Sequence, residues 1–348
     1  MKQNKLLFLL SIILIQSCSD EKQTFFSGTL KTIRFEKEYA VTGEHVNVDS
    51  IGIKDVTVMN DFLIAGVYKQ PYFAQIYDLK TLSFIGNFFY KGAGPNDFGY
   101  IDIIKKEYPY IWVQDRMYQN VRMIDLKESI LNNQTVIKNE MKYLDVVEPL
   151  NAFYVNDTCL LIKSFDTKKG LHYFRYNPVN AQLRHDVSMY NYPITSDILY
   201  TKMTPLSDCM KPDGSKIASL SGILDQIDIL DITHPQKSIS VTTTNHQYDY
   251  NYINNTNSDD MQTFYFSYPY CSDNLIFALY KNNDTKQKNN IELHIIDWNG
   301  NPLYKLLLDR EIEFFTIDFD NGFMYGTSPT EERVYRYYIE DMINLNDK

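Results

Sequence analysis

The histidines are the first residues of this chain to consider for chemistry, because imidazole can act as a general base, a general acid or a metal ligand near neutral pH. The sequence holds six of them, and no two have the i,i+2 or i,i+4 spacing that sets two rings side by side on a strand or a helix. The H-E-x-x-H motif of zinc proteases is also absent. The sequence therefore predicts no locally built metal site and no cofactor, and it leaves open a metal held on a molecular axis by ligands from distant segments. The six are His45, His172, His185, His234, His246 and His294.

Serine nucleophiles and calcium loops have equally little support. No G-x-S-x-G nucleophile motif is present. The run Asp318–Gly322 begins like a calcium loop, but no glutamate follows at the closing position, so we expect a hairpin turn there. The amide-rich and acidic run Asn254–Asp260 is expected to be a solvated loop.

The most distinctive short segment is KGAGPNDFGY, at residues 91–100. A phosphate-binding loop needs consecutive free backbone N–H groups that lead into the N-terminus of a helix. Pro95 removes one of these donors, and neither a Lys-Ser/Thr pair nor a helical pattern follows. We therefore interpret the segment as a connector between two structural units, in which Gly92 and Gly94 provide backbone angles that other residues disfavour.

A repeat explains what the connector joins. A turn residue followed by a short apolar strand occurs six times, and successive turn residues are 47 to 60 positions apart. An amphipathic strand that ends in an acid or an amide follows the turn-and-strand phrase, as in Ala74–Leu79 and Val121–Leu126, and such a side chain can start a tight turn by bonding the backbone two residues on. The six turn residues are Asp61, Pro109, Asp157, Asp213, Asp273 and Asp320.

Six units of this kind predict an all-β fold, a six-bladed β-propeller over residues 28–340. The last unit offers only three strands, at about 313–319, 322–327 and 333–339, whereas Thr29–Phe35 resembles a strand that has no unit of its own. We expect this N-terminal strand to complete the last blade and so to close the ring. Phe98 of the connector should then dock between two adjacent blades.

The N-terminus predicts export and a lipid anchor. Lys2 and Lys5 precede the apolar run Leu6–Ile15, which has the length of a signal-peptide core and is too short to span a bilayer. Residues 15–18, Ile-Gln-Ser-Cys, resemble the bacterial lipobox, which implies cleavage before Cys18 and acylation of that residue. We expect a signal peptide at 1–17, a tether at 18–27 and a tail at 341–348. The predicted location is the outer membrane, on its periplasmic or cell-surface face, with the anchor as the sole contact with lipid.

Net charge and cysteine usage limit the kinds of partner and of cysteine chemistry that the protein can have. A formal net charge of −10 argues against a nucleic-acid partner, which would require a basic surface. Once Cys18 is acylated, three cysteines remain, and this odd number permits at most one disulfide. None belongs to a C-x-x-C motif, so we expect them to serve as small apolar side chains in strands, with a disulfide left open. They are Cys159, Cys209 and Cys271.

The connector also carries a family resemblance. Its pattern G-x-G-P-x-[DE]-F, after a strand that reads F-I-G-N, resembles the inter-blade motif of NHL-type propellers, and more specifically the TolB-like six-bladed propeller lipoproteins of the Bacteroides group. The resemblance covers residues 28–340, although the other connectors lack these glycines. It implies the fold and the compartment, and it implies no reaction. The matching residues are Gly92, Gly94, Pro95, Asp97 and Phe98.

Propeller topology indicates where a site would lie. The loop between the second and third strands of a blade and the connector to the next blade project from the same face, around the axial depression, where ligands commonly bind. We predict a binding or scaffolding module for an envelope protein or a glycan. The alternative is a hydrolase or lyase for carbohydrate or peptide, which titratable side chains converging on the axis would favour; a sensor lipoprotein is a third possibility. The candidate ligand-binding residues on this face are Tyr68, Lys69, Tyr72, Lys91, Asn96, Asp97, Arg116 and Tyr118.

Overall fold

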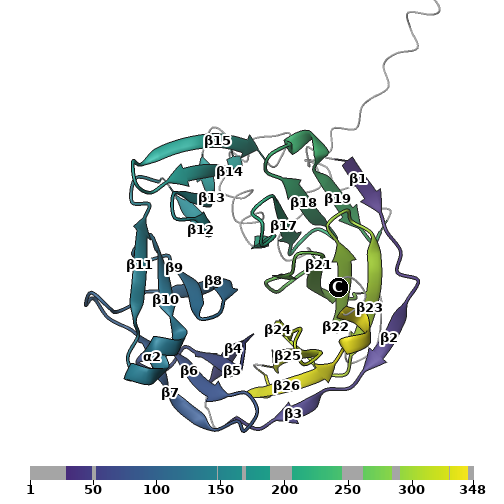
Figure 1. Cartoon of the computed structure of the whole chain (residues 1–348). Helices are drawn as coiled ribbons and strands as arrows, with labels where there is room; N and C mark the ends of the chain where they lie inside the picture. Colours follow the sequence, from purple (N-terminus) through teal and green to yellow (C-terminus); the bar gives the residue numbers. More distant parts are fainter. Residues whose placement is uncertain are drawn as a thin grey trace, which may run out of the picture.

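The structure, a computed structural model, describes residues 29–48, 52–146, 148–166, 170–188, 206–244, 262–283, 291–328 and 330–343. The strands form six small sheets arranged in a ring around a central axis (Figure 1). This arrangement confirms the predicted all-β, six-bladed propeller. The signal peptide, Cys18, the tether and the loop at 254–260 lie outside the described residues, as does most of the predicted tail.

The first three blades follow the chain in order, and each is a four-stranded antiparallel sheet. Blade 1 contains β4 (Ile53–Met59), β5 (Phe62–Val67), β6 (Tyr72–Asp78) and β7 (Phe84–Tyr90). Blade 2 contains β8 (Ile101–Glu107), β9 (Tyr110–Asp115), β10 (Asn120–Asp125) and β11 (Ile137–Lys142). Blade 3 contains β12 (Pro149–Asn156), β13 (Cys159–Asp166), β14 (Gly170–Asn177) and β15 (Gln182–Ser188).

The other three blades each include a strand from the N-terminal part of the chain. Blade 4 contains β16 (Leu206–Met210), β17 (Lys216–Ser221), β18 (Ile227–Asp231), β19 (Ile239–Thr242) and β1 (Thr29–Thr32). Blade 5 contains β20 (Tyr270–Cys271), β21 (Leu275–Lys281), β22 (Ile291–Asp297), β23 (Pro302–Leu308) and β2 (Glu38–Val41). Blade 6 contains β24 (Phe314–Asp318), β25 (Phe323–Ser328), β26 (Arg333–Tyr338) and β3 (Glu44–Val46).

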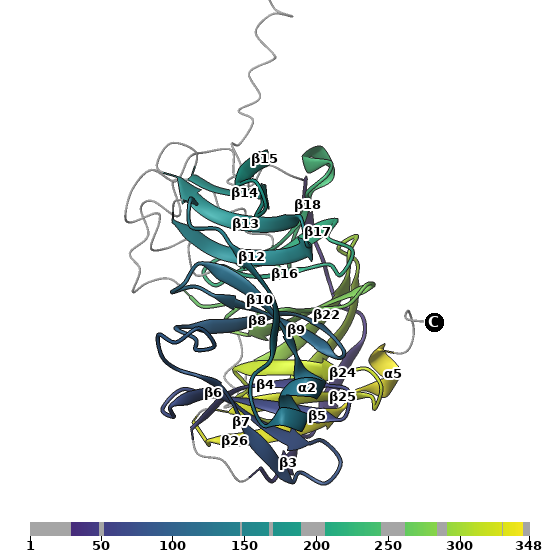
Figure 2. The same cartoon turned by 60° about the vertical axis from the view of Figure 1, so that its left-hand side comes forward.

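Three short helices complete the described part. Helix α2 (Leu126–Asn132) follows β10 and begins where the Asp125 carboxylate accepts the backbone N–H of Glu128, which satisfies one of the free donors at the helix start. It lies at the outside of the ring, as both views show (Figures 1 and 2). The 3₁₀ helix η1 (Pro235–Lys237) precedes β19, and α5 (Glu340–Ile343) follows the last strand.

The N-terminal segment closes the ring, but with a different strand from the one predicted. Strand β3 pairs antiparallel with β26, with Val46 opposite Val334. The prediction that Thr29–Phe35 closes the last blade is wrong, because β1 instead pairs in parallel with β19 of blade 4. The chain then supplies β2 to blade 5 before it reaches blade 6, so it runs along the outer edges of three successive blades (Figure 1). Each of these edges would otherwise expose unpaired backbone groups.

The core lies between adjacent blades, and the connector at 91–100 shows how two blades join. Phe98 is fully buried in a cluster that includes Phe89 of blade 1 and Val113 of blade 2, which confirms the predicted docking. The connector glycines are needed for space and not for unusual backbone angles, contrary to our expectation, since neither has a positive φ. A Cβ on Gly92 would lie 2.3 Å from the Oδ2 atom of Asp97, which accepts the backbone N–H of Gly94.

Candidate functional site

A pocket of about 370 Å³ lies on the axis of the ring, and all six blades contribute to its wall. Its lining comes mainly from the innermost strands, which are the first strands of the blades and run closest to the axis (Figure 1). This volume is in the range of small-molecule pockets in proteins. The polar and charged lining residues are Lys54, Asp55, Thr57, Tyr68, Tyr100, Asp102, Lys105, Lys106, Gln114, Arg116, Asn151, Asp208, Ser267, Tyr268, Tyr270 and Thr316.

One end of the pocket holds a group of side chains that we name the Arg116 cluster. The guanidinium of Arg116, just after β9, lies 2.7 Å from the Oδ2 atom of Asp102, near the start of the neighbouring strand β8. A second guanidinium nitrogen donates to the hydroxyl of Tyr268 at 3.3 Å. The position of Arg116 follows from the β8–β9 hairpin, where its backbone N–H donates to the carbonyl oxygen of Tyr100. The cluster consists of Asp55, Tyr68, Tyr100, Asp102, Arg116 and Tyr268.

The two carboxyl groups of the cluster differ in their surroundings. Burial, and then the negative charge of Asp102, raise the pKa of Asp55 to about 6, although a hydrogen bond from Tyr68 opposes this shift. Burial also raises the pKa of Asp102, but the adjacent Arg116 opposes the rise. The Arg116 cluster thus contains one carboxyl group that is ion-paired and one that can take up a proton in the mildly acidic range.

Glycine at position 66 makes room for Asp55. The two residues lie opposite each other on β5 and β4. A Cβ at Gly66 would lie 1.8 Å from the Oδ1 atom of Asp55, which is far inside any tolerated contact. Any larger residue at this position would therefore displace the carboxyl group.

The Arg116 cluster continues into a chain of hydrogen bonds across three blades. Arg116 donates to Oδ1 of Asn151 in blade 3 at 3.0 Å, and the amide of Asn151 donates to Oδ2 of Asp208 in blade 4 at 3.0 Å. The amine of Lys163 lies 2.9 Å from the same carboxylate, and both side chains of this ion pair are buried. Ser219 donates to the other oxygen of Asp208 at 2.6 Å. These contacts fix the positions of the polar groups that line one side of the pocket.

The second feature of the pocket is Lys106, near the other end of β8. Its amine donates to the carbonyl oxygen of Val58 in blade 1 at 3.0 Å and to the hydroxyl of Thr316 in blade 6 at 3.1 Å. It also lies 4.7 Å from the centre of the Tyr270 ring of blade 5. Burial lowers the pKa of this amine to about 7, while the charge of Asp318 acts in the opposite direction.

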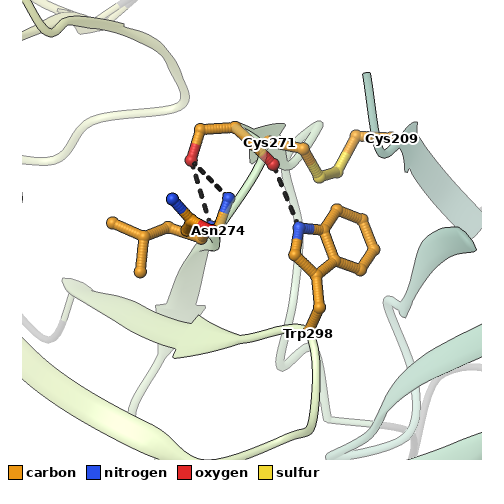
Figure 3. Close-up of a disulfide and its surroundings, with 6 residues drawn as sticks. Cys209, Cys271, Asn274 and Trp298 are labelled. Carbon is orange, nitrogen blue, oxygen red and sulfur yellow. Dashed lines mark hydrogen bonds between the residues drawn. A yellow bond between two sulfur atoms is a disulfide. The ribbon is translucent and has the colours of Figure 1, made fainter. Parts of the chain in front are cut away.

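A disulfide joins two innermost strands at the pocket wall. Cys209 of β16 is bonded to Cys271 of β20 (Figure 3). Both cysteines line the pocket, so blades 4 and 5 are covalently linked at its wall. The indole N–H of Trp298 donates to the carbonyl oxygen of Ser272 at 3.0 Å beside this bond (Figure 3). Cys159 is a free thiol. The expectation that the three cysteines act as apolar side chains is therefore wrong for Cys209 and Cys271.

Two of the eight predicted site residues, Tyr68 and Arg116, line the pocket. The amine of Lys91 donates to the carbonyl oxygen of Tyr68, and the hydroxyl of Tyr118 donates to the carbonyl oxygen of Gly92 at 2.7 Å. Of the other predicted residues, Asp97 bonds within the connector, Tyr72 packs edge-on against Tyr90, and Lys69 and Asn96 are exposed outside the pocket lining. Ligand binding by these residues remains a prediction.

The pocket residues that the sequence reasoning missed lie mainly on the innermost strands. Asp55, Asp102 and Asp208 share one signal, which is an aspartate at the second or third position of the first strand of a blade. An aspartate at this position of the first strand of a blade could have marked them. Tyr100, Lys106 and Tyr268 carried no comparable pattern.

In the part of the chain that the structure describes, no group of three or more histidine, cysteine, aspartate or glutamate side chains is arranged to hold a metal ion. No helix in the same part of the chain is both long and apolar enough to cross a bilayer.

Comparison with known proteins reveals relatives in fold. No protein-family model matches the chain, and no curated protein matches its sequence. The crystal structure of a protein named as exported, from Bacteroides fragilis, superposes with a TM-score of 0.52 and 11% identity, over 89% of this chain and 99% of the other. A member of the DUF4221 family from Bacteroides vulgatus superposes with a TM-score of 0.52 and 8% identity, over 86% of this chain and 99% of the other. At such low identities the likeness concerns the fold alone.

Proposed function

We propose that this protein is a binding module of the cell envelope that takes a segment of a glycan in its axial pocket. The observation that carries the proposal is the Arg116 cluster. Its three tyrosine rings offer flat apolar faces of the kind that sugar rings stack on, and its carboxyl groups and guanidinium offer acceptors and directional donors for hydroxyl groups. A rigid ring that holds these groups in place lowers the entropy lost on binding.

The proposed location rests on the N-terminus. The lipobox-like sequence that ends at Cys18 supports lipid anchoring in the outer membrane, and one structural neighbour from the Bacteroides group bears the name of an exported protein. The connector that contains Gly92 and Phe98 supports a TolB-like or NHL-like origin. In this proposal the anchor is the only part in contact with lipid, and the propeller is presented to the periplasm or to the outside.

A glycan array probed with the full chain, followed by calorimetric titration of the bound glycans, tests the proposal. Tyr268→Phe removes one hydroxyl from the cluster and should weaken binding about tenfold, which corresponds to the loss of one well-formed hydrogen bond of about 1.4 kcal/mol. Tyr338→Phe, an exposed tyrosine of β26, is the matched control and should bind as the wild type does. An empty array, together with capture of an envelope protein whose binding Tyr268→Phe weakens, would assign the pocket to a protein partner instead.

The geometry also favours a second candidate function. The convergence of Asp55, Asp102 and Arg116 from two blades is the arrangement expected of a hydrolase or lyase acting on carbohydrate. Such an enzyme requires one carboxyl group that holds a proton and one that is ionised. Burial raises the pKa of both aspartates, and the ion pair with Arg116 opposes the rise at Asp102, which favours Asp55 as the group that holds the proton. Release of new reducing ends from a bound glycan, abolished by Asp55→Asn at saturating glycan concentration, would establish this activity. Binding of the glycan without turnover would instead support the binding module.

A further inference from the structure

We infer that the Lys106 end of the axial pocket receives a carboxylate, so that the ligand is a glycan segment that contains an acidic sugar. The sugar part of this inference rests on the proposed function above, and the carboxylate part rests on Lys106 itself.

Lys106 is a cation in the pocket wall without an acidic partner among the residues that the structure describes. Both of its hydrogen bonds go to neutral oxygens, those of Val58 and Thr316. Among the described residues no carboxylate forms an ion pair with its amine, and Asp318 acts on it only through its more distant charge. A half-buried ammonium group without a counter-ion costs free energy, and an anionic ligand group would offset this cost.

The other cations of the pocket are already compensated. Arg116 is paired with Asp102. Lys54 lies 4.2 Å from the centre of the Tyr68 ring, and its charge lowers the pKa of Asp55. Lys105 lies 3.4 Å from Glu107 and over the Trp112 ring. Lys106 is therefore the cation of the described lining best placed to take up a ligand carboxylate.

The position of Lys106 fixes where the acidic sugar would sit. Its amine contacts the carbonyl oxygen of Val58, three residues along β4 from Asp55. Three residues of an extended strand span about 10 Å, which is close to the length of a disaccharide. Ser267 also lines the pocket, is 3% exposed, and its hydroxyl has no hydrogen-bond partner among the described residues, so a hydroxyl of the ligand could satisfy it.

The protonation of Lys106 follows from its neighbours. The titratable groups that face it are Asp318 from β24 and Tyr270 from β20, while Val58 and Thr316 carry no charge. Burial lowers the pKa of Lys106 to about 7, and a bound carboxylate would favour the ammonium form again. Binding of an acidic ligand should therefore take up protons near neutral pH, whereas binding of a neutral ligand should not.

Calorimetric titration of the full chain with cellobiouronic acid and with cellobiose tests the inference, because these two disaccharides differ by one carboxylate. We expect wild type to bind the acidic disaccharide at least tenfold more tightly than the neutral one. Lys106→Met should reduce this ratio to within twofold, chiefly through lost affinity for the acidic disaccharide. Lys138→Met, which removes an exposed cation on β11, should keep the tenfold ratio.

Several outcomes would overturn the inference. Equal affinities in wild type, or a tenfold preference that survives in Lys106→Met, would contradict it while leaving the glycan-binding function intact. Failure of both disaccharides, together with an empty glycan array, would reject the proposed function itself. Binding of acetyl-trialanine that depends on Lys106, without binding of either disaccharide, would assign the carboxylate to a peptide and overturn the acidic sugar.

A measurement on wild type alone covers the case in which Lys106→Met does not fold. Trinitrobenzenesulfonate modifies neutral amines, and peptide mapping reports the rate at Lys106. Cellobiouronic acid should slow this rate at least fivefold, and cellobiose should slow it less than twofold. Equal protection by the two disaccharides would contradict the role given to Lys106.

Discussion

The disulfide between Cys209 and Cys271 should be a major contributor to the stability of the ring. The two cysteines are separated by 62 positions in the sequence. In the chain-entropy treatment, a cross-link that closes a loop of this length removes about 14 cal/mol/K from the unfolded chain, which corresponds to about 4 kcal/mol at 25 °C. The double variant Cys209→Ser/Cys271→Ser should therefore lower the free energy of unfolding by roughly this amount.

Equilibrium unfolding in urea, followed by tryptophan fluorescence, measures this loss, and Trp298 beside the disulfide supplies part of the signal. Cys159→Ser is the matched control, because it removes a free, half-buried thiol at the start of β13 in blade 3 and should change the free energy of unfolding by less than about 1 kcal/mol. A digest without reductant should contain the two cysteine peptides as one linked species. A double variant that unfolds like the control, or a digest without the linked species, would refute the reasoning.

Three further perturbations test the pocket and the network around it. Asp55→Asn removes a carboxyl group whose pKa is higher in the folded than in the unfolded state, so the free energy of unfolding of wild type, relative to this variant, should fall by up to about 3 kcal/mol as the pH rises from about 4 to 6. Urea unfolding of both proteins at several pH values measures this difference, and a difference that does not change with pH would contradict the prediction. Gly66→Ala should lower the free energy of unfolding by about 1–3 kcal/mol, because the added Cβ meets the side chain of Asp55. The loss should be clearly smaller when Asp55→Ala is already present, and an equal loss in both backgrounds would argue against the contact. Lys163→Met leaves the buried Asp208 without its counter-ion and should lower the free energy of unfolding by about 3–5 kcal/mol in the same assay. The exposed control Lys138→Met should lower it by less than about 1 kcal/mol, and similar losses in the two variants would show that the buried pair is dispensable.

The fold could be predicted from the sequence because the repeat is local. Apart from β1, β2 and β3, the strands of each blade are consecutive in the sequence, so turn residues such as Asp61 and Asp157 and the apolar strands after them mark the hairpins of a blade. Ring closure is different, because it depends on which distant segment meets an unpaired edge. Strand β3 has only three residues, Glu44–Val46, and only Val46 is buried. Thr29–Phe35 has a stronger strand pattern, yet its first residues pair with blade 4.

The pocket could be predicted only in part, for a related reason. Loop topology alone places Tyr68 and Arg116 near the axis, since both follow the second strand of a blade. Asp102 and Lys106 lie within the innermost strand β8, whose residues are nearly all half-buried, so its burial pattern does not separate the axis from the faces toward neighbouring blades. Which of these side chains meet across blades depends on the tilt of each sheet, and a single-blade pattern does not encode that.

The strength of the ring explains how the pocket can keep polar groups that are not fully satisfied. A flexible fold would let Lys106 or the hydroxyl of Ser267 find partners by local collapse, and the pocket would fill. Here the innermost strands are fixed by the Cys209–Cys271 disulfide on one side and by the buried Lys163–Asp208 pair on another, and β3 holds the last blade closed. These contacts offset the cost of the incompletely paired groups, as is common where a binding site is preorganised. Because the ring is rigid, a ligand gains the interactions of Lys106 and the Arg116 cluster without first ordering these side chains. Recognition then depends on whether the charge and the hydroxyl groups of the ligand match these two positions, which lie about 10 Å apart along β4.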